Sequence, residues 1–172
     1  MYSIDKHDRV EELTYVPQSS VGAPEPVVLA SEHSLLLAYS LEHESDVKAA
    51  DNVLLLESHA EGPPVALVTF VRPSAHLFGP PNDEAFAGHP LSERGLERYG
   101  VFEVHRSSWI RQLERMNAVH PKHDKKWFME GKRHFIFTFH DSTFECIARG
   151  MEIAVGRGWV MSVIREGLER LR

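Results

Sequence analysis

His140 and Glu145 lie five residues apart and are the side chains of this sequence best suited to proton-transfer chemistry. A histidine beside a carboxylate can act as a general base with its orienting partner, or can supply two ligands to a metal ion. Both belong to residues 134–148, where aromatic and polar residues alternate. The local structure of this stretch decides whether the two side chains meet.

Residues 134–148 predict a β-hairpin with one apolar face. Successive side chains of a strand point to opposite faces of a sheet, and a turn at Asp141-Ser142 would pair Phe139 with Phe144. A slip of one residue would set His140 against Phe144, so the hydrophobic pattern favours this register. The predicted apolar face consists of three phenylalanines before the turn and three residues after it: Phe135, Phe137, Phe139, Phe144, Cys146 and Ala148.

The opposite face of the predicted hairpin is polar and carries Thr138, His140 and Glu145. In this register Glu145 lies diagonally across the turn from His140. His134 shares the face but is about 20 Å from His140 along a strand, so the two histidines cannot share a metal ion. A third ligand would have to come from elsewhere in the chain, where His76, His89 and His105 are available. The alternative is a solvent-facing sheet surface that merely tolerates histidine.

A helix that begins at Ser142 competes with the hairpin. Ser142 and Glu145 have the spacing of a capping box, and apolar residues recur at helical spacing as far as Val155. Three glycines between residues 150 and 158 would each destabilise such a helix by about 1 kcal/mol. We therefore expect the hairpin.

Residues 74–98 predict a long irregular loop that would cover the polar face. The segment contains three prolines and three glycines, and loops of this length are often functional. Asn82, Asp83 and His89 could close over a small molecule or bind a divalent cation. The alternative is a capping turn, in which Asn82 caps a short helical turn through Phe86.

The composition is that of an ordinary globular protein, with 42% hydrophobic and 26% charged residues. The single cysteine, Cys146, excludes an internal disulfide framework and a multi-cysteine zinc site, and its place on the apolar face predicts a buried thiol. No apolar run is long enough to cross a bilayer, and the first residues lack a signal-peptide pattern. We expect a cytoplasmic protein without a membrane partner.

Charge is distributed unevenly along the sequence. Residues 1–86 carry 4 basic and 14 acidic side chains, whereas residues 87–172 carry 15 basic and 11 acidic ones. The only basic cluster, residues 120–134, contains Trp127 and Phe128. It is short, and we expect it to be a solvated connector whose aromatic side chains pack into the core and not a nucleic-acid site.

The predicted architecture is one α+β domain over residues 1–172, with a loose or strand-like N-terminal arm at 1–26. We expect a curved antiparallel sheet of about six strands with two main helices, at about 107–118 and 158–171, packed on it. Besides the hairpin, short apolar runs between turn residues predict five strands: 27–30, 34–41, 52–57, 65–71 and 100–105.

The leading functional hypothesis is a small bacterial-type protein that binds a small ligand or a metal ion on the polar face of the hairpin, under the 74–98 loop. Catalysis or metal binding would fall to His89, His140 and Glu145, while the sequence leaves open whether the protein is an enzyme and assigns no cofactor. The alternative is a non-catalytic inhibitor or immunity-type module that docks through its acidic N-terminal half. The predicted ligand-binding residues are Asn82, Asp83, His89, Thr138, His140 and Glu145.

Overall fold

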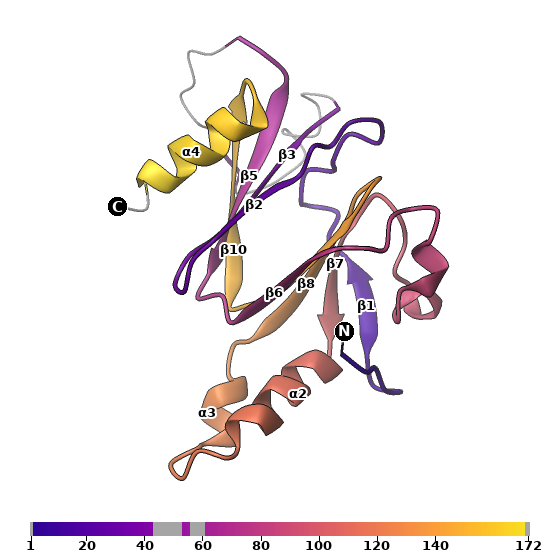
Figure 1. The fold of residues 1–172 in the computed structure, drawn as a ribbon, viewed down its shortest axis with the longest axis vertical. Coiled ribbons are helices and arrows are strands. Elements are labelled where there is room, and N and C mark those ends of the chain that lie inside the picture. Colours follow the sequence, from indigo (N-terminus) through magenta and orange to yellow (C-terminus); the bar gives the residue numbers. More distant parts are fainter. Residues whose placement is uncertain (1, 43–52, 56–60, 171–172) are drawn as a thin grey trace.

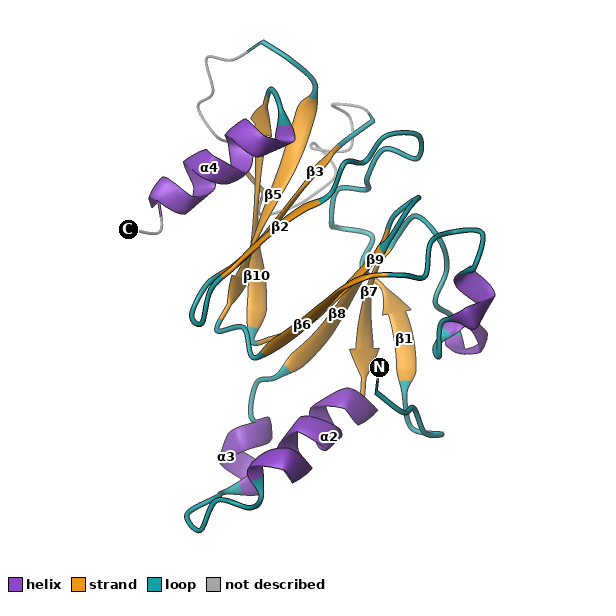
Figure 2. Ribbon diagram, viewed as in Figure 1, coloured by secondary structure: helices purple, strands orange, loops and turns teal. Residues whose placement is uncertain are grey.

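The computed structural model describes residues 2–42, 53–55 and 61–170 and shows an α+β fold. Two five-stranded sheets pack against each other, and helices lie on their outer faces (Figures 1 and 2). The strands are β1 (Arg9–Glu12), β2 (Val27–Ala30), β3 (Leu35–Ser40), β4 (Val53–Leu55), β5 (Pro64–Val71), β6 (Ala75–Gly79), β7 (Val101–His105), β8 (Arg133–Thr138), β9 (Thr143–Ala148) and β10 (Gly150–Arg157). The helices are α2 (Ser108–Asn117), α3 (Lys125–Met129) and α4 (Val160–Arg170).

The strands divide between a first sheet, in the order β1-β7-β8-β9-β6, and a second sheet, in the order β2-β3-β5-β10-β4. All neighbours pair antiparallel except β4 and β10, which are parallel. The ladder between β6 and β9 continues into the ladder between β5 and β10, with only Arg149 between β9 and β10. The two sheets are therefore joined at a corner, where the sequence predicted a single curved sheet with fewer strands.

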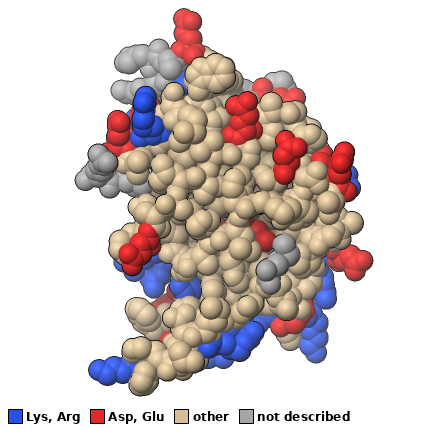
Figure 3. All heavy atoms as spheres, viewed as in Figure 1, with Lys and Arg blue, Asp and Glu red and all other residues tan. Residues whose placement is uncertain are grey.

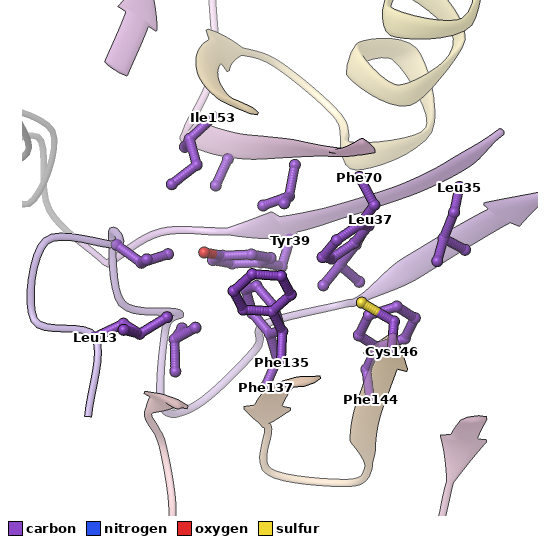
Figure 4. Packing of buried hydrophobic residues seen from close by; sticks show 14 of the residues in the cluster. Leu13, Leu35, Leu37, Tyr39, Phe70, Phe135, Phe137, Phe144, Cys146 and Ile153 are labelled. Atoms are coloured by element: carbon purple, nitrogen blue, oxygen red, sulfur yellow. The ribbon is translucent and has the colours of Figure 1, made fainter. Parts of the chain in front are cut away.

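The main core lies between the two sheets and is rich in aromatic rings (Figure 4). Phe70 of β5 contacts Phe135, Phe137 and Phe144 of the first sheet, with ring centroids 5.5–6.3 Å apart. All six residues of the predicted apolar hairpin face belong to this core, which confirms that face. Cys146 is fully buried there, as predicted, and burial raises the pKa of its thiol well above the usual value.

The hairpin forms as predicted, but its register differs by two residues from the predicted one. Phe144 pairs with Phe137, not with Phe139, and the Phe139 N–H donates to the Ser142 carbonyl at 2.8 Å. The turn is therefore centred on His140 and Asp141, which places the two most polar residues of the loop at its tip. Because the shift is an even number of residues, every side chain keeps its predicted face and changes only its neighbours.

The second hairpin face is buried from His134 to Thr138, which excludes the alternative of a solvent-facing polar surface there. Ile136 and Ile147 on this face belong to a second hydrophobic cluster that covers the outer face of the first sheet. Its other members come from β7, α2, the N-terminal arm and the loop after β6, and include Trp109, Ile110, Tyr2, Phe86, Leu91 and Leu96. Polar side chains on this face must consequently find partners inside the protein.

The flanking segments differ from the predictions in detail. The predicted N-terminal arm includes β1, which pairs with β7, and Tyr2, whose ring stacks on Trp109 at 5.2 Å. The predicted 74–98 loop begins with strand β6, so the irregular part starts at Pro80. The predicted strand at 52–57 is described only over Val53–Leu55, and the rest of it lies outside the described residues.

The two predicted helices are confirmed as α2 and α4. Ser107 caps α2, since its Oγ accepts the Ile110 N–H at 3.3 Å. Helix α4 packs on the second sheet through Val160, Val163 and Ile164. Gly167 permits this close packing, because a Cβ at that position would lie 2.5 Å from the Leu67 side chain. No helix within the described residues is long and apolar enough to span a membrane.

Replacement of Phe137 by alanine should destabilise the protein by about 3–5 kcal/mol, because the ring fills the centre of the core between the sheets. Phe78 on β6 provides the matched control, since 46% of its surface is exposed. The Phe78→Ala variant should lose about 1 kcal/mol or less. Urea unfolding of both variants measures the difference, and similar losses would contradict this placement of the core.

Candidate functional site

The carboxylate of Glu145 is the centre of a buried polar cluster on the outer face of the first sheet. The Tyr2 hydroxyl donates to Glu145 Oε2 at 2.6 Å, and His134 Nε2 lies 2.9 Å from the same oxygen. His89 Nε2 lies 3.4 Å from Oε1. All four side chains are buried, so the protein replaces the water that would otherwise solvate the carboxylate.

Three segments that are distant in sequence bring these groups together. Glu145 lies on β9 opposite Ile136, so its diagonal neighbours on the same face are His134 and Thr138. The irregular segment after β6 contributes His89, directly after the short 3-10 turn Phe86–Gly88. The N-terminal arm contributes Tyr2, whose ring also contacts that of His134 at 5.4 Å.

The hydrogen-bond network assigns the protonation of His89 and the donor role of His134. The Leu91 N–H donates to His89 Nδ1 at 3.1 Å, so the proton of His89 is on Nε2 and the ring is neutral. Ser107 Oγ lies 2.9 Å from His134 Nδ1 and already accepts the Ile110 N–H, so its own proton is free to point to Nδ1. Ser107 Oγ has a second acceptor position and can pair with Nδ1 in either protonation state, and in both states His134 donates from Nε2 to Glu145.

Glu145 is therefore an ionised carboxylate held by three hydrogen-bond donors. Burial by itself would raise the pKa of Glu145, but the hydrogen bonds from His134, His89 and Tyr2, together with the electrostatic attraction of His134, outweigh burial and lower the pKa to about 2. Burial and the neighbouring Glu145 raise the pKa of the Tyr2 hydroxyl far above its usual value, so Tyr2 remains a donor. Within the described residues, no Lys or Arg side chain pairs with this carboxylate.

A small pocket of about 150 Å³ adjoins Glu145. Its polar wall includes Glu145 and Thr143 of β9, and its other residues come from β6 and the start of the following loop. Thr143 Oγ1 donates to the Pro81 carbonyl at 2.9 Å, which fixes the loop at the rim of the pocket. The complete lining is Leu77, Phe78, Gly79, Pro80, Thr143 and Glu145.

The structure places His140 apart from Glu145, with Asp83 and Tyr99. His140 Nδ1 lies 2.9 Å from Asp83 Oδ2, and the Tyr99 hydroxyl donates to the same oxygen. The hydrogen bonds from Tyr99 and then His140 lower the pKa of Asp83, and the Asp83 bond raises the pKa of Tyr99. The predicted His140–Glu145 pair depended on the predicted register, and the two-residue shift gives Glu145 His134 as its neighbour instead.

The other predicted site residues fix the loop to the hairpin. Thr138 Oγ1 accepts the Gly100 N–H at 2.9 Å and donates to the Glu97 carbonyl at 3.0 Å. The Asp83 N–H donates to the His140 carbonyl at 3.0 Å. Asn82 Oδ1 accepts the Ala85 N–H at 3.0 Å just before the 3-10 turn, in agreement with the capping alternative.

Sequence reasoning placed His89 and Glu145 in one site, and the structure brings these two side chains together. It missed Tyr2, His134 and Tyr99. His134 was predicted on the correct face, and only the register separated it from Glu145. Tyr2 and Tyr99 had no recognisable signal, because each reaches its partner through a long-range contact. Their place in the network follows from the packing of the N-terminal arm and of the loop before β7.

Two familiar catalytic arrangements do not fit the cluster. Ser107, His134 and Glu145 form a hydrogen-bonded chain, but Ser107 is buried and serves as the cap of α2, so a substrate cannot reach its hydroxyl. Among the described residues, no three His, Cys, Asp or Glu side chains are arranged to hold a metal ion.

The charged surfaces considered from the sequence lie elsewhere. In Figure 3 most of the visible basic side chains gather over the end of the molecule that carries α2 and α3. Trp127 of α3 is 68% exposed, and Phe128 is half-buried beneath Lys132, which corrects the expectation that both rings pack into the core. The acidic N-terminal half lies partly outside the described residues, so docking through it stays a prediction.

Comparison with protein-family models, with curated proteins and with solved structures finds no match for this chain. The chemistry of the site therefore has to be inferred from its own geometry.

The Glu145→Gln variant should be destabilised by roughly 3 kcal/mol at neutral pH, because the lowered pKa reflects stabilisation of the ionised form. This stabilisation is complete above the ordinary pKa of 4.5 and is lost as the pH falls toward about 2. Urea unfolding should therefore show a gap between wild type and variant that narrows below about pH 5. The exposed Glu152, replaced by glutamine, is the control. A gap that does not change with pH would contradict an ionised Glu145.

Proposed function

We propose that the protein binds a small ligand with a positively charged amino or guanidinium group, in the pocket between Glu145 and β6. The proposal keeps the hypothesis of a ligand under the loop that follows β6 and replaces the metal ion by an organic cation. We also propose a cytoplasmic location, in keeping with the single buried cysteine.

The observation that carries the proposal is a buried carboxylate at the wall of a pocket, with which no Lys or Arg side chain of the described residues pairs. Burial of a charge is unfavourable unless it is paired and hydrogen-bonded. Tyr2, His89 and His134 satisfy part of the hydrogen-bonding capacity of Glu145. A carboxylate has about four acceptor positions, so at least one position is available to a ligand.

The shape and lining of the pocket limit the ligand to a small group. About 150 Å³ accommodates an ammonium or guanidinium group with a short aliphatic stem. Leu77, Phe78 and Pro80 provide apolar walls for such a stem, while Glu145 receives the charged end. An apolar wall with one charged acceptor is typical of sites that bind amphipathic side-chain-sized ligands.

Butylammonium should bind wild-type protein in the millimolar range, because one ion pair and a short stem supply only modest affinity. Butanol, which lacks the charge, should bind at least about tenfold more weakly. Chemical-shift titration of the Thr143 and Glu145 amides measures both affinities.

Two variants identify the group responsible for this binding. Glu145→Gln should abolish the preference for butylammonium over butanol, and its folded state can be checked in the same spectra. His140→Ala removes the histidine at the hairpin tip, outside the pocket, and should leave both affinities unchanged. Equal binding of the amine and the alcohol to wild type, or a loss of binding in His140→Ala, would overturn the proposal.

A further inference from the structure

We propose that the end of the molecule formed by α2, α3 and the loop between them docks on the surface of an anionic lipid bilayer. The docking surface is residues 115–127, which we call the α2–α3 tip. It brings basic side chains to the lipid headgroups and exposed apolar side chains to the boundary beneath them. The tip is separate from the pocket beside Glu145, so it does not depend on the proposed function. Such docking replaces the expectation of a protein without a membrane partner, which considered only segments that cross a bilayer.

The α2–α3 tip is an ordered surface at the opposite end of the molecule from α4 (Figure 1). Within its loop, the His120 N–H donates to the Asn117 carbonyl at 3.0 Å, and the His123 N–H donates to the His120 carbonyl at 2.9 Å. His123 Nε2 lies 3.0 Å from Glu114 Oε1, which ties the loop to α2. The side chains of the tip are therefore presented from a defined backbone.

The apolar stripe of α2 continues beyond the part of the helix that the protein covers. Trp109 and Leu113 pack into the outer cluster, whereas Met116, which follows at the same helical spacing, is 63% exposed. Val119 in the loop is 87% exposed, and Trp127 on α3 is 68% exposed. Apolar surface in water is unfavourable, so these three side chains gain free energy from an apolar partner.

The α2–α3 tip is basic in a protein whose net charge is -6. Residues 115–127 contain four basic side chains and one acidic side chain, Asp124, which caps α3 by accepting the Trp127 N–H at 2.8 Å. Of the four, Lys125 alone forms an ion pair within the described ranges, 3.9 Å from Glu114. The basic residues are Arg115, Lys122, Lys125 and Lys126.

The combination of basic and aliphatic side chains favours lipid over nucleic acid. An anionic bilayer presents negative headgroups above an apolar layer, and tryptophan prefers the boundary between the two. A nucleic acid offers phosphates for the lysines and base faces for Trp127. It has no apolar layer for Met116 and Val119, which are the side chains that distinguish the two partners.

Charge polarity across the molecule determines which end meets the bilayer. In Figure 3 most of the charged side chains visible at the end opposite the tip are acidic. That end also exposes a tryptophan and a methionine, since Trp159 is 77% and Met161 is 64% exposed. However, residues 159–170 carry two basic and two acidic side chains. An anionic surface therefore attracts the tip more strongly than α4, and α4 supplies matched control residues.

Co-sedimentation with phospholipid vesicles tests the docking of the wild-type protein. Vesicles of equal parts phosphatidylserine and phosphatidylcholine should bind at least about tenfold more tightly than vesicles of phosphatidylcholine alone, because each basic residue near an anionic surface strengthens binding about fivefold. Binding to the anionic vesicles should weaken as the salt concentration rises, since salt screens the attraction between exposed charges.

Two pairs of charge variants locate the basic surface. The double variant Lys122→Gln, Lys126→Gln should bind the anionic vesicles about 25-fold more weakly, because two charges leave the tip. The double variant Arg165→Gln, Arg170→Gln removes the same charge from α4 and should change binding by no more than about twofold, because those charges lie far from the bilayer.

Two further double variants locate the apolar contact. Met116→Ser with Trp127→Ala should weaken binding at least about tenfold, because these side chains no longer enter the lipid boundary. Met161→Ser with Trp159→Ala removes the same residue types, with similar exposure, from the α4 end and should leave binding unchanged. Thermal unfolding checks that every variant remains folded, as expected for exposed positions.

Several results would overturn the proposal. These are equal binding to both kinds of vesicle, no binding to either, or a loss of binding in the α4 variants while the tip variants still bind. A DNA oligonucleotide that binds through Lys122 and Lys126, while vesicles do not bind, would assign the tip to nucleic acid. Self-association without lipid that the tip variants abolish, again without vesicle binding, would assign the tip to a second copy of the chain.

Discussion

The buried carboxylate of Glu145 is the constraint on which the outer half of this protein depends. A charge placed on a buried sheet face needs internal hydrogen-bond donors, and they come from the N-terminal arm, from the loop after β6 and from β8. Ser107 extends the network, since the residue that caps α2 also contacts His134. One side chain thus joins the arm, the loop, the hairpin and a helix of the first sheet.

The two faces of the hairpin pack against different surroundings. The aromatic face fills the space between the sheets and accounts for the packing of the fold. The opposite face combines Ile136 and Ile147 with a polar cluster that retains a negative charge. The charge is tolerated because hydrogen-bond donors surround it, and a small pocket adjoins Glu145. In the proposed function, stability and binding draw on the same carboxylate.

The spacing of apolar and polar residues was sufficient to predict the two faces of the hairpin, the class of the fold and its two main helices. It was not sufficient to predict neighbours across the strands, because those depend on the turn. Moving the turn from Asp141-Ser142 to His140-Asp141 keeps every face and exchanges the partner of Glu145. Strand β6 was assigned to a loop because Pro80 and Pro81 follow it, and contacts such as that of Tyr2 across 143 positions leave no local trace.

The most direct test of this account is the ionisation of Glu145 and the tautomer of His89 in the folded protein. Carbon-13 and nitrogen-15 NMR should show a Glu145 carboxylate that stays ionised down to about pH 3, together with a His89 ring protonated only at Nε2. A Glu145 that titrates at or above its ordinary pKa, or a His89 protonated at Nδ1, would contradict the hydrogen-bonded carboxylate cluster and the cation site proposed from it.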